Sequence, residues 1–208
     1  MSMESWEQTI TLLKQEMESK HEARERALRS SRSIIQLSSR AIKHVHRGQL
    51  PDAANLIDEA KQLASEARAS MVGHPEIEYA GYLQDAEKEL VEACACLAIV
   101  AGDPLPTPHS LSVQANAYLH GMGECASELR RTVLDLMRQG NMSRAEELFE
   151  QMEEIYDSLT TFDFPDGLTG GLRRTCDALR AVIERTRSDM TMTRVQQDLL
   201  NELKRAGR

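Results

Sequence analysis

The stretch YLHGMGECASELRR (residues 118–131) reads as part of one long helix with two different faces. Glu124 and Glu128 are four residues apart, so their carboxylates lie on the same helical face, one turn from each other. Ala117 and Gly121 precede them on that face. An apolar stripe lies roughly opposite and consists of Tyr118, Met122, Cys125, Leu129, Val133 and Leu136. An acidic face on a helix is usually only solvated, so a second observation is needed before it indicates a site.

That second observation is another acidic pair, Glu89 and Glu92, within KELVEACACLAIVAG (residues 88–102). The three-residue spacing again puts both side chains on one side of a helix. No charged residue follows Glu92 until Asp103, and a helix that is apolar all round is a buried one. Glu92 therefore lies where a solvated face becomes interior, which is an unfavourable place for an unpaired carboxylate.

The two acidic pairs predict a metal site if their helices face each other. Four converging carboxylates repel one another, and a bound cation relieves that repulsion. Ligands that are all oxygen favour Mg²⁺, with Mn²⁺ as the other candidate. The candidate metal ligands are therefore Glu89, Glu92, Glu124 and Glu128.

The acidic segments resemble the translin and Trax family, and more closely its Trax (translin-associated protein X) branch. The resemblance rests on ELVEA (residues 89–93) together with YLHGMGECASELRR. In Trax, a Glu-x-x-Glu-Ala segment on one helix, and an acidic residue four positions before a Glu on another, supply the metal-binding carboxylates of an endoribonuclease. The resemblance thus implies that Glu89, Glu92, Glu124 and Glu128 are catalytic as well as metal-binding. Eukaryotic Trax has Asp at the position of Glu124, whose carboxylate reaches one methylene further.

The resemblance extends over most of the chain. KHEARERALRSSRSIIQLSSRAIKHVHRG (residues 20–48) looks like the first long helix of the family, and FDFPDGLTGGLRRTCDALRAVIERTRSDM (residues 162–190) is similar to its C-terminal helical segment. Family members assemble into closed, barrel-like oligomers, typically octamers, that enclose RNA. Resemblance to an archaeal-type single-chain member implies a homo-oligomer with RNA, single-stranded or in a short duplex, as its partner. Single-stranded DNA is a second candidate partner.

Composition predicts an all-α protein. Aromatic residues make up 4% of the 208 residues, and there are only 6 Pro and 11 Gly. We expect one domain over residues 1–208, folded as a translin-like bundle of six to seven helices with long N- and C-terminal helices. The chain has no run of about 18 apolar residues and no basic N-terminus followed by an apolar core, so we expect neither a membrane span nor a signal peptide.

The four cysteines, Cys94, Cys96, Cys125 and Cys176, lie in mostly apolar helical settings and lack the spacing of a zinc site. Reduced, buried cysteines predict a cytoplasmic protein. His44 and His46 point roughly 200° apart on a helix, which argues against a metal site between them.

A basic face follows the first predicted helix although the net charge of the chain is −8. Residues 20–47 carry a local charge of +6, which leaves −14 for the rest. The predicted nucleic-acid-binding residues recur at helical spacing over about 27 Å and are Arg29, Arg32, Arg40, Lys43 and Arg47. A solvated helix face is the alternative interpretation. Because no aromatic residues interleave with the basic ones, any binding is expected to be directed at the nucleic-acid backbone.

Breaks in the pattern predict the order of helices. A first helix spans about residues 4–47, a second runs from Pro51 to about residue 72, and a third opens at Pro75 and carries Glu89 and Glu92. A stiff connector then contains the prolines of GDPLPTPHS (residues 102–110). The Glu124 helix spans about residues 112–139. Ser143 and Glu146 form a predicted capping box for a helix to about residue 159. After a loop of residues 160–167, a last helical region, expected to break near residues 188–193, reaches the C-terminus.

These observations favour a Mg²⁺-dependent endoribonuclease that hydrolyses phosphodiester bonds with a cluster of carboxylates. No pair of histidines for the 2′-hydroxyl route of cleavage is evident. One alternative is a translin-like protein that binds RNA or single-stranded DNA without cleaving it. Another is a helical scaffold or metal-binding regulator whose acidic faces serve a partner protein.

Overall fold

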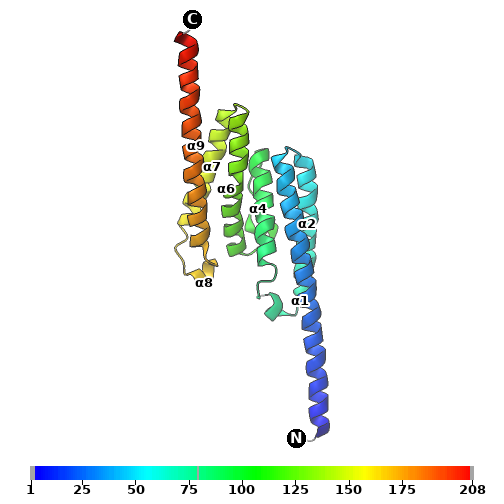
Figure 1. The fold of residues 1–208 in the computed structure, drawn as a ribbon. Helices are drawn as coiled ribbons and strands as arrows, with labels where there is room; N and C mark the ends of the chain where they lie inside the picture. The colour runs from blue at the N-terminus through cyan, green and yellow to red at the C-terminus, as the bar shows by residue number, and fades with distance from the viewer. Residues whose placement is uncertain (1–2, 79, 207–208) are drawn as a thin grey trace.

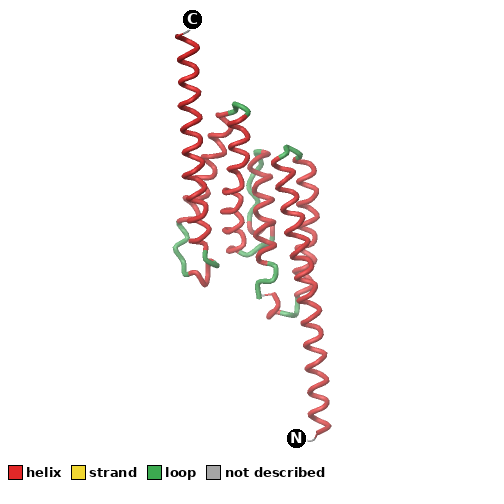
Figure 2. Tube along the Cα trace, viewed as in Figure 1, coloured by secondary structure: helices red, strands yellow, loops and turns green. Residues whose placement is uncertain are grey.

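The regular structure of the chain is entirely helical (Figure 1). The computed structural model describes residues 3–78 and 80–206, and no strand occurs among them (Figure 2). Six longer helices are α1 (Met3–His46), α2 (Leu50–Met71), α4 (Gln84–Ala101), α6 (Ala115–Arg138), α7 (Met142–Thr160) and α9 (Leu172–Ala206). The short helices are α3 (Pro75–Glu78), α5 (Pro108–Leu111) and α8 (Asp166–Thr169). The predicted all-α class, with long first and last helices, is confirmed.

The longer helices pack side by side, and α4 lies between α1 and α2 on one side and α6 on the other. Helices α7 and α9 cover the opposite side of α6 (Figure 1). Every residue of α4 from Leu90 to Cys96 is buried, which explains why the helix has no charged residue after Glu92. The central helix α4 and its neighbour α6 are the two that carry the acidic pairs.

The N-terminal part of α1 and the C-terminal part of α9 extend past the packed helices at opposite ends of the molecule (Figure 1). Large apolar side chains are exposed on both extensions. On α1 they are Met3, Trp6, Leu12, Leu13 and Met17, and on α9 they are Met192, Val195, Leu199, Leu200 and Leu203. Within the described part of the chain, no helix is long and apolar enough to cross a membrane.

The helix predicted to open at Pro75 is two helices. α3 ends at Glu78, and α4 starts at Gln84 after a turn in which Gly81 has φ of 79°. That left-handed conformation does not continue an α-helix, and glycine adopts it without steric cost. Pro75 therefore opens α3, and the helix that carries Glu89 and Glu92 begins nine residues later.

Three local predictions were wrong. Pro108 occupies the first turn of the short helix α5, where its missing N–H costs nothing, so the proline-rich connector is not extended throughout. Helix α7 is capped by the side chain of Asn141, which accepts a hydrogen bond from the backbone N–H of Arg144, and not by Ser143. Helix α9 runs unbroken through residues 188–193, where the hydroxyls of Thr191 and Thr193 bond to carbonyls of the preceding turn.

Candidate metal centre

Gly121 of α6 lets the two acidic helices approach each other closely. A Cβ atom at this position would lie 2.6 Å from the backbone oxygen of Lys88 and 2.6 Å from Cβ of Val91, both on α4. Any side chain there would push the helices apart. The small residue that the sequence places on the acidic face of α6 is therefore the point of contact with α4.

Across this contact, three of the four predicted ligands come together. One carboxylate oxygen from each of Glu89, Glu92 and Glu124 lies within 4.8 Å of the others. Glu92 is the buried member, whereas Glu89 and Glu124 are partly exposed. Carboxylates from two helices around one point offer the all-oxygen ligands that Mg²⁺ and Mn²⁺ prefer, so the residues present fit such an ion.

The electrostatics of Glu92 indicate that burial and carboxylate repulsion outweigh the positive charge near this side chain. Burial raises the pKa of Glu92 to about 8, and the carboxylates of Glu89, Glu124 and Glu128 add to the rise. Burial also raises the pKa of Glu89. No cation among the described residues forms an ion pair with Glu92. An ionised Glu92 therefore needs a cation from outside the chain.

Lys88 supplies part of the missing charge to the other two carboxylates. Its Nζ lies 2.8 Å from Oε1 of Glu124 and 3.6 Å from Oε1 of Glu89. Burial lowers the pKa of Lys88, but the hydrogen bond to Glu124 and the surrounding carboxylates outweigh burial and raise it overall. The ammonium group is therefore firmly protonated at neutral pH.

Glu128, the fourth predicted ligand, lies outside the three-carboxylate cluster. Its Oε1 accepts a hydrogen bond of 2.5 Å from Nε2 of His46, near the end of α1. The His46 side chain is only 4% exposed, and its Nδ1 lies 3.4 Å from the hydroxyl of Thr132. The hydrogen bond from His46 lowers the pKa of Glu128. Glu128 is thus oriented and kept ionised beside the cluster, and its role as a ligand stays a prediction.

The predicted basic stripe is exposed along α1. None of its five residues forms an ion pair with another described residue, so their charges are available to a polyanion. These residues are Arg29, Arg32, Arg40, Lys43 and Arg47. The C-terminal end of the stripe is adjacent in sequence to His46, which bonds to Glu128. One end of the stripe is therefore next in sequence to a residue that contacts Glu128, and the binding role of the stripe stays a prediction.

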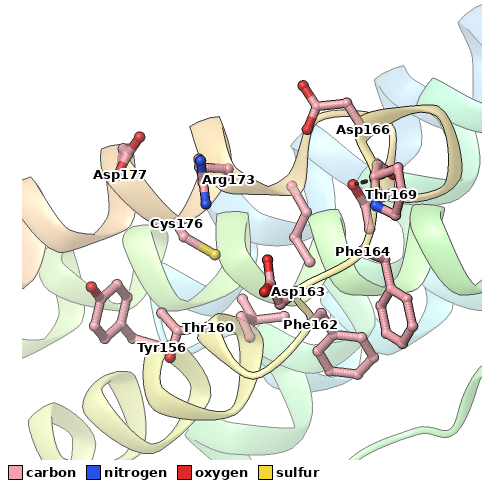
Figure 3. A pocket seen from close by; sticks show the side chains of 13 residues that line it. Tyr156, Thr160, Phe162, Asp163, Phe164, Asp166, Thr169, Arg173, Cys176 and Asp177 are labelled. Atoms are coloured by element: carbon pink, nitrogen blue, oxygen red, sulfur yellow. Dashed lines mark hydrogen bonds between the residues drawn. The ribbon is translucent and has the colours of Figure 1, made fainter.

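A cavity of about 750 Å³ lies away from the carboxylate cluster, between the end of α7, the following loop, α8 and the start of α9 (Figure 3). Phe162 and Phe164 lie at one end with ring centroids 6.5 Å apart, and Tyr156 lies at the other. The cavity also contains Arg173, but none of the four predicted catalytic glutamates lines it. Size alone therefore does not locate the candidate site.

His46 and Lys88 are two residues of the site that the helical pattern does not indicate. The spacing of His44 and His46 bears only on whether the two bind one metal ion, and in the structure they contact different helices. Nδ1 of His44 lies 3.7 Å from Asp52 of α2, whereas His46 bonds to Glu128 of α6. Lys88 directly precedes Glu89, but its main partner is 36 residues away on α6. Such partners depend on how helices pack, which a helical-periodicity pattern does not specify.

The fold and the cluster together define a helical bundle with a carboxylate site between two adjacent helices. A scan against models of protein families finds none that matches the chain. The chain is 33% identical to AfC3PO in a complex with duplex RNA, with a TM-score of 0.84 over 90% of this chain and 97% of that one. The crystal structure of AfC3PO alone gives the same identity and TM-score. The chain belongs to the translin/Trax-type C3PO family.

Two further proteins are similar to the chain. The chain is 29% identical to an uncharacterized protein of Methanocaldococcus jannaschii over 189 residues. The aligned region covers 89% of this chain and 83% of the relative. Apo-NeC3PO is 22% identical with a TM-score of 0.80 over 88% of this chain and 96% of that chain. At that identity, NeC3PO supports the fold alone.

Proposed function

We propose that this protein is a Mg²⁺-dependent endoribonuclease that binds RNA inside a closed homo-oligomer and hydrolyses its phosphodiester bonds. The observation that carries the proposal is the cluster of Glu89, Glu92 and Glu124, in which buried Glu92 has no counter-ion from the described part of the chain. The family relation supports the choice of RNA, because AfC3PO forms a complex with duplex RNA.

The side chains have distinct roles in this proposal. Glu89, Glu92 and Glu124 hold the cation, with Mn²⁺ as an alternative to Mg²⁺. A divalent cation bound there supplies a water molecule of lowered pKa and positive charge for the scissile phosphate. Glu128, fixed by His46 and kept ionised, would complete the catalytic set as a group that can accept a hydrogen bond from the attacking water.

RNA is held in this proposal by the exposed stripe on α1. Its five cationic residues follow one helical face and are free of ion pairs with described residues, so they can neutralise successive phosphates. Contacts of this kind position the RNA backbone without reading its sequence. The same contacts allow single-stranded DNA to bind as well.

Self-assembly is supported by the apolar faces of the two helix extensions. On α1, Met3, Trp6, Ile10, Leu13 and Met17 recur at steps of three and four residues, which is the spacing of a coiled-coil seam. All except Ile10 are exposed in the single chain. Side chains of this type gain free energy when a second copy covers them. The octamer typical of the family is the expected assembly.

Two further properties belong to the proposal. Residues 1–208 form one domain in this proposal, because the larger of two apolar clusters draws on all six longer helices. The four cysteines are buried as free thiols, and the Cys96 thiol donates a 3.3 Å hydrogen bond to the sulfur of Cys125 without forming a disulfide. Neighbouring free thiols fit a reducing cytoplasm.

The proposal is tested by cleavage of a labelled single-stranded RNA and a short duplex, with Mg²⁺ and with EDTA. We expect Mg²⁺-dependent cleavage by the wild-type protein, and a loss of at least about 100-fold in Glu92→Gln, because removing a catalytic metal ligand removes most of the charge stabilisation. Glu150→Gln is the matched control, since Glu150 is exposed on α7 and lies outside the cluster.

Three results would contradict the proposed nuclease. Cleavage by Glu92→Gln at the wild-type rate, with assembly unchanged, would show that the carboxylate cluster does not take part in the reaction. Tight, salt-sensitive RNA binding without cleavage would instead identify a translin-like binding protein. Absence of any nucleic-acid binding would favour the scaffold or regulator.

A further inference from the structure

Lys88 contacts two of the three carboxylates in the cluster, Glu89 and Glu124. It lies one residue before Glu89 on α4 and reaches across to α6, where it donates a 2.8 Å hydrogen bond to Glu124. Its side chain is 23% exposed, so the pair is partly shielded from water. The ammonium group thus engages oxygens from both helices that form the cluster.

An ammonium group and a divalent cation compete for the same oxygens. The three N–H groups of a lysine use carboxylate lone pairs that a metal would also need. Two cations within a few ångströms of each other repel strongly where solvent is partly excluded. A metal ion that binds the oxygens of Glu89 and Glu124 contacted by Lys88 would therefore compete with both of these contacts.

From this competition we infer that Lys88 is a built-in counter-ion, which holds Glu89 and Glu124 in place before metal binding and is displaced when the metal binds. The inference rests on the proposed metal site. Lys88 acts through the two carboxylates, so it is a positioning residue. Lys88 sets how tightly the site binds metal. Before metal binds, its positive charge keeps the carboxylates of Glu89 and Glu124 from moving apart through mutual repulsion.

The structure provides a place for the displaced side chain. A pocket of about 280 Å³ adjoins the cluster and is lined by Lys88, Glu124, Gln84, Asp85 and His120, among others. Asp85 is exposed and lies three residues before Lys88 on the same helix, at a spacing suited to an ion pair. The flexible lysine stem can turn its ammonium group toward Asp85 without any movement of the backbone.

Metal affinity is the first test. Titration calorimetry with Mg²⁺ and with Mn²⁺ at one pH and ionic strength is expected to show about tenfold tighter binding in Lys88→Met, because a competing charge is removed. Lys88→Arg keeps the charge and is expected to stay within about twofold of the wild type. Lys61→Met is the matched control: it removes the same charge from α2, where Lys61 pairs with Asp58. Equal or weaker binding by a folded Lys88→Met would overturn the inference.

Lysine acylation of the wild-type protein is a second test that needs no variant. A limiting amount of an amine-acylating reagent, followed by peptide mass spectrometry, measures how reactive Lys88 is. We expect acylation of Lys88 to rise several-fold when Mg²⁺ is added, because the amine loses its two carboxylate partners, while Lys61 stays unchanged. Unchanged or slower acylation of Lys88 with bound metal would contradict displacement, even if Lys88→Met does not fold.

The same measurements separate this inference from the proposed function. A wild-type protein that binds Mg²⁺ and shows the Lys88 effects but does not cleave RNA would refute the nuclease and leave the counter-ion role supported. A wild-type protein that binds no divalent cation would overturn both. Cleavage with no response of Lys88 to metal would overturn the counter-ion role alone.

Discussion

Gly121 is the residue on which the geometry of the carboxylate cluster depends. Gly121→Ala puts a methyl group 2.6 Å from atoms of Lys88 and Val91, so α4 and α6 have to separate. Overpacking of this kind costs about 1–3 kcal/mol of unfolding free energy, more than the roughly 1 kcal/mol that alanine gains over glycine within a helix. We expect a lower midpoint in urea denaturation and weaker metal binding.

Gly167→Ala is the control for that substitution. No atom lies within 4 Å of a Cβ built at Gly167 in α8, so the change is expected to raise the free energy of unfolding slightly, by up to about 1 kcal/mol. If Gly121→Ala were as stable as Gly167→Ala and bound metal normally, close contact at this point would not be what aligns the two acidic helices.

Glu92 makes the stability of the metal-free protein depend on pH. Its pKa rises from an ordinary value of 4.5 to about 8, so the folded state retains a proton that the unfolded chain has lost. The resulting stability is fully present below about pH 4.5 and is lost as pH rises toward 8. We expect a loss on the order of a few kcal/mol across this window in urea denaturation.

Glu92→Gln is expected to flatten that pH profile, because its amide does not ionise. Adding Mg²⁺ to the wild-type protein is expected to restore stability near pH 8, since the cation favours the ionised carboxylate. Glu128 has a lowered pKa, and its effect lies at acid pH below its ordinary value with the opposite sign, so it leaves this window unaffected. A wild-type profile that is flat from pH 5 to 8 would contradict the assignment of Glu92.

At the scale of helices, an ion pair between Arg68 and Glu87 joins α2 to the first turn of α4. Nη1 of Arg68 lies 2.7 Å from Oε1 of Glu87, whose side chain is 9% exposed, and Nη2 donates to the carbonyl of Leu111 at the end of α5. Arg68→Met leaves Glu87 buried without a partner, although the apolar stem is kept. We expect a loss of about 2–4 kcal/mol in unfolding free energy.

Lys61→Met provides the comparison for Arg68→Met, because Lys61 forms an exposed ion pair with Asp58 on the same helix. Such surface pairs contribute about 0–1 kcal/mol, so this variant is expected to unfold near the wild-type midpoint. The pKa of Glu87 is raised by burial, and protonation at low pH should therefore reduce the cost of Arg68→Met. Equal midpoints for the two variants would show that Glu87 finds another partner.

Helical periodicity and composition were enough to predict the helical class and the two acidic faces, because both depend on neighbours within one or two turns. The helix boundaries that were predicted wrongly depend on local choices between alternative turns, caps and side-chain hydrogen bonds. Gly81 turns the chain before α4, and Asn141 caps α7 two residues earlier than the predicted Ser143. Threonines near residue 190 look like a break, yet their hydroxyls bond within α9 and the helix continues.

The candidate site shows the same division between local and distant causes. The spacing of Glu124 and Glu128 predicts one face, but only packing decides that Glu124 joins the α4 acids while Glu128 bonds to His46. Lys88 reaches its partner because Gly121 allows the helices to touch. The Lys88–Glu124 and His46–Glu128 contacts join residues that are 36 and 82 positions apart in the sequence. Such contacts depend on how whole helices cross, and helical periodicity does not specify that crossing.

At the scale of the whole molecule, the two helix extensions place apolar surface far from the core of the single chain. Met192, Val195, Leu199 and Leu203 recur at steps of three and four residues on the C-terminal half of α9, whose end projects past the packed helices (Figure 1). Each is more than half exposed, and burying such a side chain contributes about 1.5–3 kcal/mol. A stable interface would cover this stripe in the assembled protein.

The double variant Val195→Glu with Leu199→Glu tests this role of α9. Two charges in a buried apolar contact oppose association, so we expect a smaller oligomer by size-exclusion chromatography with light scattering. Helical content by circular dichroism should stay near that of the wild type, since glutamate is a good helix former. Asp198→Ala with Glu202→Ala, on the same extension, is the control and should keep the wild-type mass. An unchanged mass for the double glutamate variant would place the assembly contacts elsewhere, and the exposed α1 extension would then be the next segment to test.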